Sequence, residues 1–347
     1  MGFDTSLQRV WYRPRVGWVA VLLLPLSWLF GLVARLRRAG YRAGWFKTVQ
    51  VERPVIVVGN ITVGGTGKTP FTIWLADALQ RRGRRVGIVL RGYGGRSLAT
   101  PTQVTATTDW REVGDEAVLL ARSTRAIVVA GADRVAGARR AIQLGADLVL
   151  SDDGLQHYRL GRDGEIAILD AARLLGNGLL LPAGPLREPP SRLAQASCVV
   201  LMHKEASEAP PLPEIVAGHL HLVANARLRA AQSLQSGELR ELASFRHGPV
   251  HAVAGIGNPQ AFFAALTAAG LEVRAHPMSD HAVLDRADIT FPDDAPVLMT
   301  EKDAVKCARV ADGRHWAVAM DVQMSAADTA TVMSIVERAA ARKGPAT

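Results

Sequence analysis

Apolar residues are distributed along the chain in two patterns. An uncharged run of 19 residues extends from Val16 to Ala34; as a helix it would be about 28 Å long, close to the hydrocarbon thickness of a bilayer. From residue 53 onward, short continuous apolar runs alternate with helical stretches. Continuous runs are typical of parallel strands covered on both faces. Together the patterns predict an α/β fold with a mostly parallel sheet and an N-terminal apolar helical segment.

The predicted elements fall into two sets, separated by a linker rich in proline and acid at Ala206–Glu214. Before the linker we predict a helix at Pro70–Gln80 and strands at Val55–Val58, Val86–Leu90, Ala126–Ala130, Asp147–Leu150, Ile166–Leu169 and Cys198–Met202. After it we predict a helix at Pro259–Ala269 and strands at His219–Ala224, Ala226–Ala230, Val250–Ala254, Val297–Thr300 and Trp316–Met320. The chain therefore divides into a helical segment (1–48), a larger α/β domain (49–218) and a smaller α/β domain (219–347), with a cleft between the two domains.

Positive charge is concentrated at the N-terminus. The formal net charge is +9, and residues 1–48 hold eight basic residues against the single acid Asp4. Basic residues beside an apolar run indicate an anionic membrane surface as the partner. The rest of the chain is nearly neutral, which disfavours nucleic acid. Cys198 and Cys307 are far apart and lack metal-ligand spacing, which is typical of a reducing, cytoplasmic compartment.

The apolar run itself has several interpretations. A cleaved signal peptide is disfavoured, because the run is followed by an Arg-rich segment and not by a small-residue cleavage site. We favour a helix embedded in the cytoplasmic leaflet, kinked at Pro25 and bordered by interfacial tryptophans, namely Trp11, Trp18, Trp28 and Trp45. A single membrane span and a buried core helix stay open as alternatives.

A glycine-rich loop joins the first predicted strand to the first predicted helix. Its sequence is Thr62-Val63-Gly64-Gly65-Thr66-Gly67-Lys68-Thr69, and a strand–loop–helix context is what a phosphate-binding Walker A loop requires. Glycines let backbone amides surround the β- and γ-phosphates, the lysine supplies a positive charge, and the last threonine supplies a hydroxyl to Mg²⁺.

One position departs from the usual motif. Thr62 replaces its first glycine, so the backbone there must suit a β-branched residue, or Gly59-Asn60 makes the turn instead. The loop predicts that 49–218 is a P-loop NTPase-like domain that binds ATP with Mg²⁺.

Carboxylates follow the strand predicted at Asp147–Leu150. Asp152 and Asp153 stand where a P-loop enzyme places its metal-binding acid. If the backbone is extended, one carboxylate holds metal while the other contacts Lys68 or the nucleophile; a solvated Asp-Gly turn is the alternative. Asp115, at a predicted helix N-terminus, and the Asp280-His281 step are candidate proton acceptors, though both are also compatible with structural roles.

The ordered set of motifs resembles the tetraacyldisaccharide 4'-kinase family of lipid A biosynthesis. The motifs are GNITVGGTGKTP (59–70), RGYGG (91–95), VGDE (113–116), SDDGLQH (151–157), LLPAGPLREP (180–189), Asp280-His281 and TEKDAVK (300–306). The resemblance covers nearly the whole chain, and the family's loop also carries threonine at the position of Thr62.

The resemblance implies an activity and roles for particular residues. The activity is ATP- and Mg²⁺-dependent phosphorylation of the 4'-hydroxyl of an acylated glucosamine disaccharide 1-phosphate, giving lipid IVA at the cytoplasmic face of the inner membrane. It implies Asp115 and His281 as the proton-accepting pair. It implies phosphate and metal roles for Lys68, Thr69, Asp152, Asp153 and Glu188. Neither a nucleic acid nor an obligate protein partner is expected.

Two other functions share the same generic motifs. One is a P-loop kinase for a different membrane-embedded acceptor, such as a polyprenol. The other is a nucleotide-switched membrane binding protein that hydrolyses ATP or GTP without phosphorylating a small molecule. The sequence contains no guanine-reading NKxD motif, which disfavours a GTPase.

Overall fold

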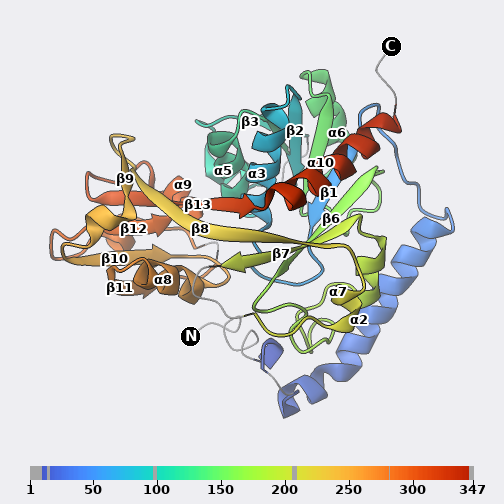
Figure 1. The fold of residues 1–347 in the computed structure, drawn as a ribbon, viewed down its shortest axis with the longest axis horizontal. Helices are drawn as coiled ribbons and strands as arrows, with labels where there is room; N and C mark the ends of the chain where they lie inside the picture. The colour runs from blue at the N-terminus through green and yellow to red at the C-terminus, as the bar shows by residue number, and fades with distance from the viewer. Residues whose placement is uncertain (1–9, 14–15, 97–99, 205–208, 281, 344–347) are drawn as a thin grey trace.

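The computed structural model describes residues 10–13, 16–96, 100–204, 209–280 and 282–343. Its centre is one sheet of 13 strands in the order β11-β10-β12-β13-β8-β7-β6-β1-β5-β2-β4-β3, with β9 paired to β8 (Figure 1). The strands are β1 Val55–Gly59, β2 Val86–Leu90, β3 Thr102–Val104, β4 Ile127–Ala130, β5 Leu148–Asp152, β6 Gly164–Asp170, β7 Cys198–Lys204, β8 His221–Ser233, β9 Leu239–Glu241, β10 Pro249–Ala254, β11 Glu272–Pro277, β12 Val297–Thr300 and β13 His315–Met324.

Helices cover the sheet and flank it. The α-helices are α2 Trp18–Arg42, α3 Lys68–Gln80, α4 Trp110–Val113, α5 Asp115–Ser123, α6 Arg134–Gln143, α7 Glu214–Ala217, α8 Pro259–Ala268, α9 Glu301–Cys307 and α10 Ala326–Ala341. Short 3-10 helices lie at Pro190–Gln195, Leu242–Phe245 and Ala287–Ile289. Most strand pairs are parallel, and the antiparallel pairs in the described chain are β3 with β4, β8 with β9, and β8 with β13. This confirms the predicted fold class.

The first strands are buried on both faces, as their continuous apolar sequences predict. Ile56 and Val58 pack in one core cluster with Phe71 of α3, while Val55 and Val57 belong to a second cluster on the opposite face. Alternate side chains of a strand point to opposite faces, so β1 contributes to both clusters. Each such fully buried aliphatic side chain stabilises the fold by about 1.5–3 kcal/mol.

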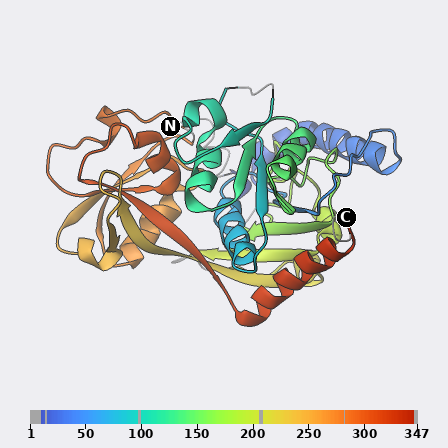
Figure 2. The same cartoon turned by 90° about the horizontal axis from the view of Figure 1, so that it is seen from above.

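A two-stranded ribbon links the two ends of the sheet. β8 pairs in parallel with β7 through its first residues and antiparallel with β13 along most of its length. β13 in turn pairs with β12, so the long strands cross between the two groups of elements (Figure 2). The sheet is therefore continuous across residue 218, and the division into domains at that point stays a prediction.

Several predicted elements were wrong in extent. The strands expected at His219–Ala224 and Ala226–Ala230 form the single strand β8, because alternating burial continues through Asn225 without interruption. The strand expected at Asp147–Leu150 continues to Asp152. Of the predicted linker Ala206–Glu214, residues 206–208 lie outside the described residues, and the last residue, Glu214, begins α7.

The N-terminal helix α2 lies along one side of the body and is mostly exposed (Figure 1). Its buried residues are small, and Ser27 donates a hydrogen bond of 2.8 Å to the carbonyl of Leu180. Nine of its large apolar side chains are more than half exposed: Trp18, Val21, Leu22, Leu26, Trp28, Leu29, Leu32, Val33 and Leu36. The interpretation as a buried core helix is therefore wrong.

Three of the four tryptophans predicted to lie at a membrane interface are exposed, and the fourth is not. Trp28 and Trp45 are 69% and 81% exposed, which suits a membrane interface. Trp11 is instead buried and donates a hydrogen bond of 2.9 Å to the carbonyl of Pro182, so its predicted interfacial place is wrong. By length and composition α2 is able to cross a membrane.

Candidate active site

The phosphate loop connects the end of β1 to the start of α3. Gly64 and Gly67 have φ of 108° and 89°, a left-handed conformation that glycine adopts without strain. A Cβ on Gly67 would lie 2.7 Å from Cγ of Met202, so this glycine is also required for space. Thr62 is accommodated because it forms a strand-like bridge with Leu186. The turn is made by Gly64 and Gly67, and the alternative turn at Gly59-Asn60 was wrong.

Lys68 is held at the mouth of the loop by two partners. Its Nζ lies 3.0 Å from Oδ1 of Asp153 and donates a hydrogen bond of 2.9 Å to Oδ1 of Asn60. Asn60 is buried, and its amide also donates to Oγ1 of Thr66 at 3.1 Å. Asn60 therefore fixes both the loop and its lysine, a role that sequence reasoning missed although the residue lies only two positions before the loop.

Asp152 and Asp153 have different environments although they are adjacent. Asp152 ends β5, is 2% exposed and accepts a 2.9 Å hydrogen bond from Oγ1 of Thr72. Burial, and then the nearby Glu116 carboxylate, raise the pKa of Asp152 to about 6. Burial also raises the pKa of Asp153. The ion pairs with Lys68 and Arg187 outweigh burial and lower this pKa below the usual range.

The backbone at this strand end separates the two carboxylates. Asp153 has φ of 47°, a conformation that aspartate tolerates better than most residues. The solvated Asp-Gly turn considered as an alternative was wrong, because Asp153 pairs with Lys68 and Arg187 at 3.0 Å each.

The loop that carries Arg187 and Glu188 is tied to the phosphate loop by backbone hydrogen bonds. The amide of Arg187 donates to the carbonyl of Ile61 at 2.7 Å, and the amide of Val63 donates to the carbonyl of Pro185 at 2.8 Å. Glu188 is 4% exposed, and its carboxylate accepts hydrogen bonds from Gln156 and from the hydroxyl of Tyr158. This loop therefore brings a cation and a fixed carboxylate to the nucleotide site.

Asp115 begins α5 and is 3% exposed. Its Oδ1 accepts a 2.8 Å hydrogen bond from the amide of Glu116. Lys302 of α9 lies 3.4 Å from Glu116 and 3.6 Å from Asp280, so α9 connects the two acidic segments. His281, the other half of the proposed pair, lies outside the described residues.

A cavity of about 970 Å³ joins these groups. Its wall includes the loop residues Val63 to Pro70, the acids Glu116, Asp152, Asp153 and Glu188, and the basic residues Arg91, Arg134, Arg187, Lys204 and Lys302. Phe30, Val33 and Ala34 of α2 line the same cavity. Asp115 is not among its lining residues, whereas its neighbour Glu116 is. The cavity therefore extends from the phosphate loop to the exposed N-terminal helix.

Several residues of this wall were not assigned roles from the sequence. Lys204, at the end of β7, donates to the carbonyl of Gly65 at 2.8 Å and pairs with Asp170 at 2.6 Å. Arg134 is buried, donates to the backbone carbonyl of Asp152 at 3.0 Å, and has its pKa lowered to about 10, first by burial. Burial and then Arg134 lower the pKa of His157 to about 4, so that histidine is neutral at pH 7. Lys302 could have been identified from the sequence, because it lies within the TEKDAVK motif (300–306).

The donor set fits a P-loop magnesium site. The described residues contain no cluster of three His, Cys, Asp or Glu side chains suited to a metal. A P-loop enzyme needs no such cluster, because one hydroxyl and one carboxylate act together with phosphate oxygens and water. Thr69 and Asp152 share the cavity, and the buried carboxylate of Asp152 suits a cation. The carboxylate of Glu188 is already engaged by Gln156 and Tyr158, so its assignment as a ligand stays a prediction.

The chain is similar to known proteins over nearly all of its length. A family model described as Tetraacyldisaccharide-1-P 4'-kinase matches residues 19–340. The Tetraacyldisaccharide 4'-kinase of Alkalilimnicola ehrlichii is 49% identical over 317 residues, which cover 90% of this chain and 91% of the relative. The protein of that name from Nitrosococcus oceani is 45% identical over 343 residues, or 98% and 97% of the two chains.

A solved structure matches as well. LpxK from Aquifex aeolicus, crystallised in complex with ATP, superposes with a TM-score of 0.79 at 29% identity, covering 93% of this chain and 99% of that one. These similarities confirm the family resemblance derived from the motifs.

Proposed function

This chain belongs to the tetraacyldisaccharide-1-P 4'-kinase family of lipid A biosynthesis, and we propose that its cavity transfers the γ-phosphate of ATP to the 4'-hydroxyl of a membrane-embedded tetraacyldisaccharide 1-phosphate. The product is lipid IVA. One observation carries this proposal: the cavity that contains the phosphate loop is also lined by Phe30, Val33 and Ala34 of the exposed helix α2. An acylated acceptor held along α2 would reach the nucleotide without leaving the lipid.

The phosphate loop binds ATP and orients its γ-phosphate. Backbone amides between Gly64 and Thr69 surround the phosphates, and the N-terminus of α3 faces the same anionic group. Lys68 exchanges its contacts with Asn60 and Asp153 for oxygens of the β- and γ-phosphates. Arg187, beside Asp153, adds charge that stabilises the transferring phosphoryl group.

Thr69 and Asp152 would hold Mg²⁺, which supplies further positive charge beside the β- and γ-phosphates when bound. Glu188 is the third residue assigned to this site. Because both acids lie at strand or loop ends fixed by hydrogen bonds, little side-chain ordering is left for nucleotide binding.

The acceptor hydroxyl is a weak nucleophile, so a base removes its proton as it attacks. We assign this role to Asp115 with His281, on the basis of the family resemblance. The acceptor oxygen bonds to the γ-phosphorus, the bond from that phosphorus to the β–γ bridging oxygen breaks, and ADP leaves. Asp115 lies in the first turn of α5, where the positive end of the helix dipole stabilises a negative charge.

Membrane association follows from the chemistry of the acceptor and from α2. Its exposed apolar side chains match lipid, and the basic residues that surround it match anionic headgroups. We place the protein at the cytoplasmic face of the inner membrane, with no nucleic acid or obligate protein partner.

The test is ATP-dependent conversion of the disaccharide monophosphate to the bisphosphate in detergent. Lys68→Ala is expected to lower kcat roughly 100- to 1,000-fold. Arg81→Ala, which removes an exposed surface ion pair with Asp77, is the control and should leave kcat unchanged. Normal turnover by Lys68→Ala would refute the proposal.

The same assay separates the alternatives. Turnover of a polyprenol in preference to the disaccharide would favour a kinase for another acceptor. Release of free phosphate with no phosphorylated lipid would favour a nucleotide switch.

A further inference from the structure

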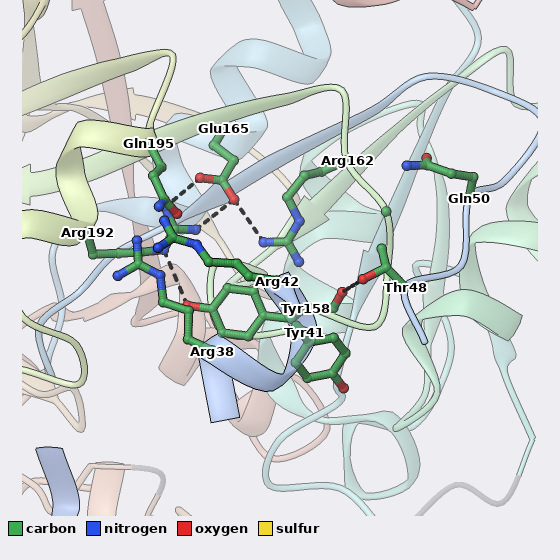
Figure 3. Close-up of a pocket in the computed structure, with 11 residues that line it drawn as sticks. Arg38, Tyr41, Arg42, Thr48, Gln50, Tyr158, Arg162, Glu165, Arg192 and Gln195 are labelled. Carbon is green, nitrogen blue, oxygen red and sulfur yellow. Dashed lines mark hydrogen bonds and ion pairs between the residues drawn. The ribbon is translucent and has the colours of Figure 1, made fainter. Parts of the chain in front are cut away.

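A second, smaller pocket lies beside the C-terminal end of α2, away from the phosphate loop. Its volume is about 260 Å³, and four arginines line it: Arg38, Arg42, Arg162 and Arg192. Figure 3 shows Arg38, Arg42 and Arg192 beside the ring of Tyr158, with Glu165 between Arg192 and Arg162. One carboxylate among four guanidinium groups leaves the pocket strongly positive.

Two of the arginines form a fixed floor. Arg192 is 1% exposed, and its Nη1 and Nη2 each donate to the carboxylate of Glu165 at 2.7 Å. Arg162 donates to the same carboxylate at 2.9 Å. Such bidentate, charge-assisted pairs hold their side chains in one geometry, so this side of the pocket is preorganised for a ligand.

The other two arginines lack an anion. In the described part of the chain, no carboxylate lies within ion-pair distance of Arg38 or Arg42, and Nε of Arg38 is buried with no hydrogen-bond partner. A buried donor without a partner costs free energy unless a ligand satisfies it. Burial lowers the pKa of Arg38; among the neighbouring groups, Tyr158 and Glu188 raise this pKa, and the like charges of Arg42 and Arg192 lower it.

The position of the pocket indicates where its ligand comes from. In the sequence, its lining residues Arg38 and Arg42 come between Leu36, the last large exposed apolar residue of α2, and the exposed Trp45 that follows the helix. Tryptophan and arginine at the end of an apolar helix mark the level of lipid headgroups. Tyr158 lines both this pocket and the large cavity, so one side chain contributes to both.

We propose that this pocket binds a phosphate group carried by a lipid, with Arg38 and Arg42 as donors above the fixed floor of Arg192 and Glu165. Planar guanidinium groups suit phosphate oxygens. Two sources share this chemistry: the 1-phosphate of the acylated acceptor and the headgroup of an anionic phospholipid. The first source rests on the proposed function, whereas the second does not.

The experiment uses full-length protein and three single variants. Arg38→Gln and Arg42→Gln each remove one donor without touching the buried floor, so they preserve the fold. Arg35→Gln is the matched control, because it removes one exposed arginine from the same helix but outside the pocket. It reports the general loss of one positive charge near the membrane.

The first arm measures KM for the acceptor in neutral detergent micelles, with and without its 1-phosphate. If the 1-phosphate is the ligand, both pocket variants raise KM roughly tenfold for the phosphorylated acceptor only. The control leaves KM unchanged.

The second arm measures binding to phosphatidylcholine vesicles with and without phosphatidylglycerol. If a headgroup is the ligand, the pocket variants lose roughly fivefold more binding to the anionic vesicles than the control does. Pocket variants that match Arg35→Gln in both arms would overturn the proposal. Absence of turnover in the unmodified protein would refute the kinase assignment instead, and the vesicle arm would still be readable.

Discussion

The two ends of the large cavity are built in opposite ways. Around the phosphate loop, charged groups are shielded and paired: Asp152 is 2% exposed, and Lys68 contacts both Asn60 and Asp153. At the other end, where α2 lines the cavity, the apolar Val33 is 57% exposed.

The difference matches the ligand proposed for each end, a nucleotide at the loop and an acylated acceptor along α2. Charges act strongly on a phosphoryl group only where water is excluded. Exposed apolar side chains, in contrast, are favourable only where lipid covers them. Substitutions at the loop should therefore change the chemical step, and substitutions on α2 should change lipid access, each with little effect on the other.

The largest expected effect is a loss of kcat when Asp115, the proposed base, is replaced. Asp115→Asn should lower kcat roughly 100- to 10,000-fold, because it removes the base proposed to accept the proton of the acceptor hydroxyl. Steady-state kinetics in detergent checks this, and vesicle binding should not change. Glu112→Gln, an exposed acid on the preceding helix α4, is the control; an equal loss there would point to a general electrostatic effect.

The next effect tests the other region. Replacing Leu22 and Leu29 by serine should lower vesicle binding at least about tenfold, because each leucine buried in lipid contributes about 1.5–3 kcal/mol. In detergent, kcat should stay unchanged. Leu239→Ser is a matched control, since Leu239 is 67% exposed on β9, far from α2 along the sheet (Figure 1). Loss of kcat in the α2 variant would break the separation between the two regions.

Removing residues 1–48 extends the same test. The truncated protein should remain in the soluble fraction and lose activity mainly through a higher KM for the acceptor. Sedimentation with membranes equal to that of the full chain would contradict the role of α2 as the anchor.

A smaller effect concerns the tight packing of the loop. Gly67→Ala introduces a Cβ at φ of 89°, 2.7 Å from Met202, and should destabilise the protein by about 1–3 kcal/mol. Gly83→Ala is matched, because Gly83 has φ of 81° but nothing within 4 Å of its built Cβ. Thermal unfolding should give a lower Tm for Gly67→Ala than for Gly83→Ala. Equal values would show that strain alone, and not the contact with Met202, limits this position.

The smallest effect is a pH dependence of the loop region alone. Burial, and then Glu116, raise the pKa of Asp152 to about 6, so its carboxylate is charged above that pH and protonated below it. Because the charged form is the one proposed to hold Mg²⁺, kcat/KM should fall by up to about tenfold per pH unit below pH 6. Vesicle binding should stay constant over this range, since arginines around α2 do not titrate there. A rate profile that is flat from about pH 5 to about pH 7 would contradict the role proposed for Asp152.

The candidate site was predictable wherever neighbouring residues determine the geometry. The glycine pattern from Gly64 to Lys68 specifies a turn between a strand and a helix, and the structure has that turn. The apolar run from Val16, bordered by arginines and tryptophans, favoured a helix at a membrane over a buried core helix, and α2 is mostly exposed. The extent of α2 to Arg42 was missed, because arginine continues a helix as well as leucine does.

Tertiary structure alone decided which distant residues meet. Lys204 reaches Gly65 across 139 positions of sequence, and Lys302 reaches Glu116 across 186. Those contacts depend on the strand order and on the β8–β13 ribbon, which no local pattern encodes. The sequence determines the local structure of a segment through interactions between neighbouring residues. Only the folded sheet brings the charges, the loop and the apolar helix together around one cavity, because groups far apart in the sequence interact appreciably only when the fold places them close in space.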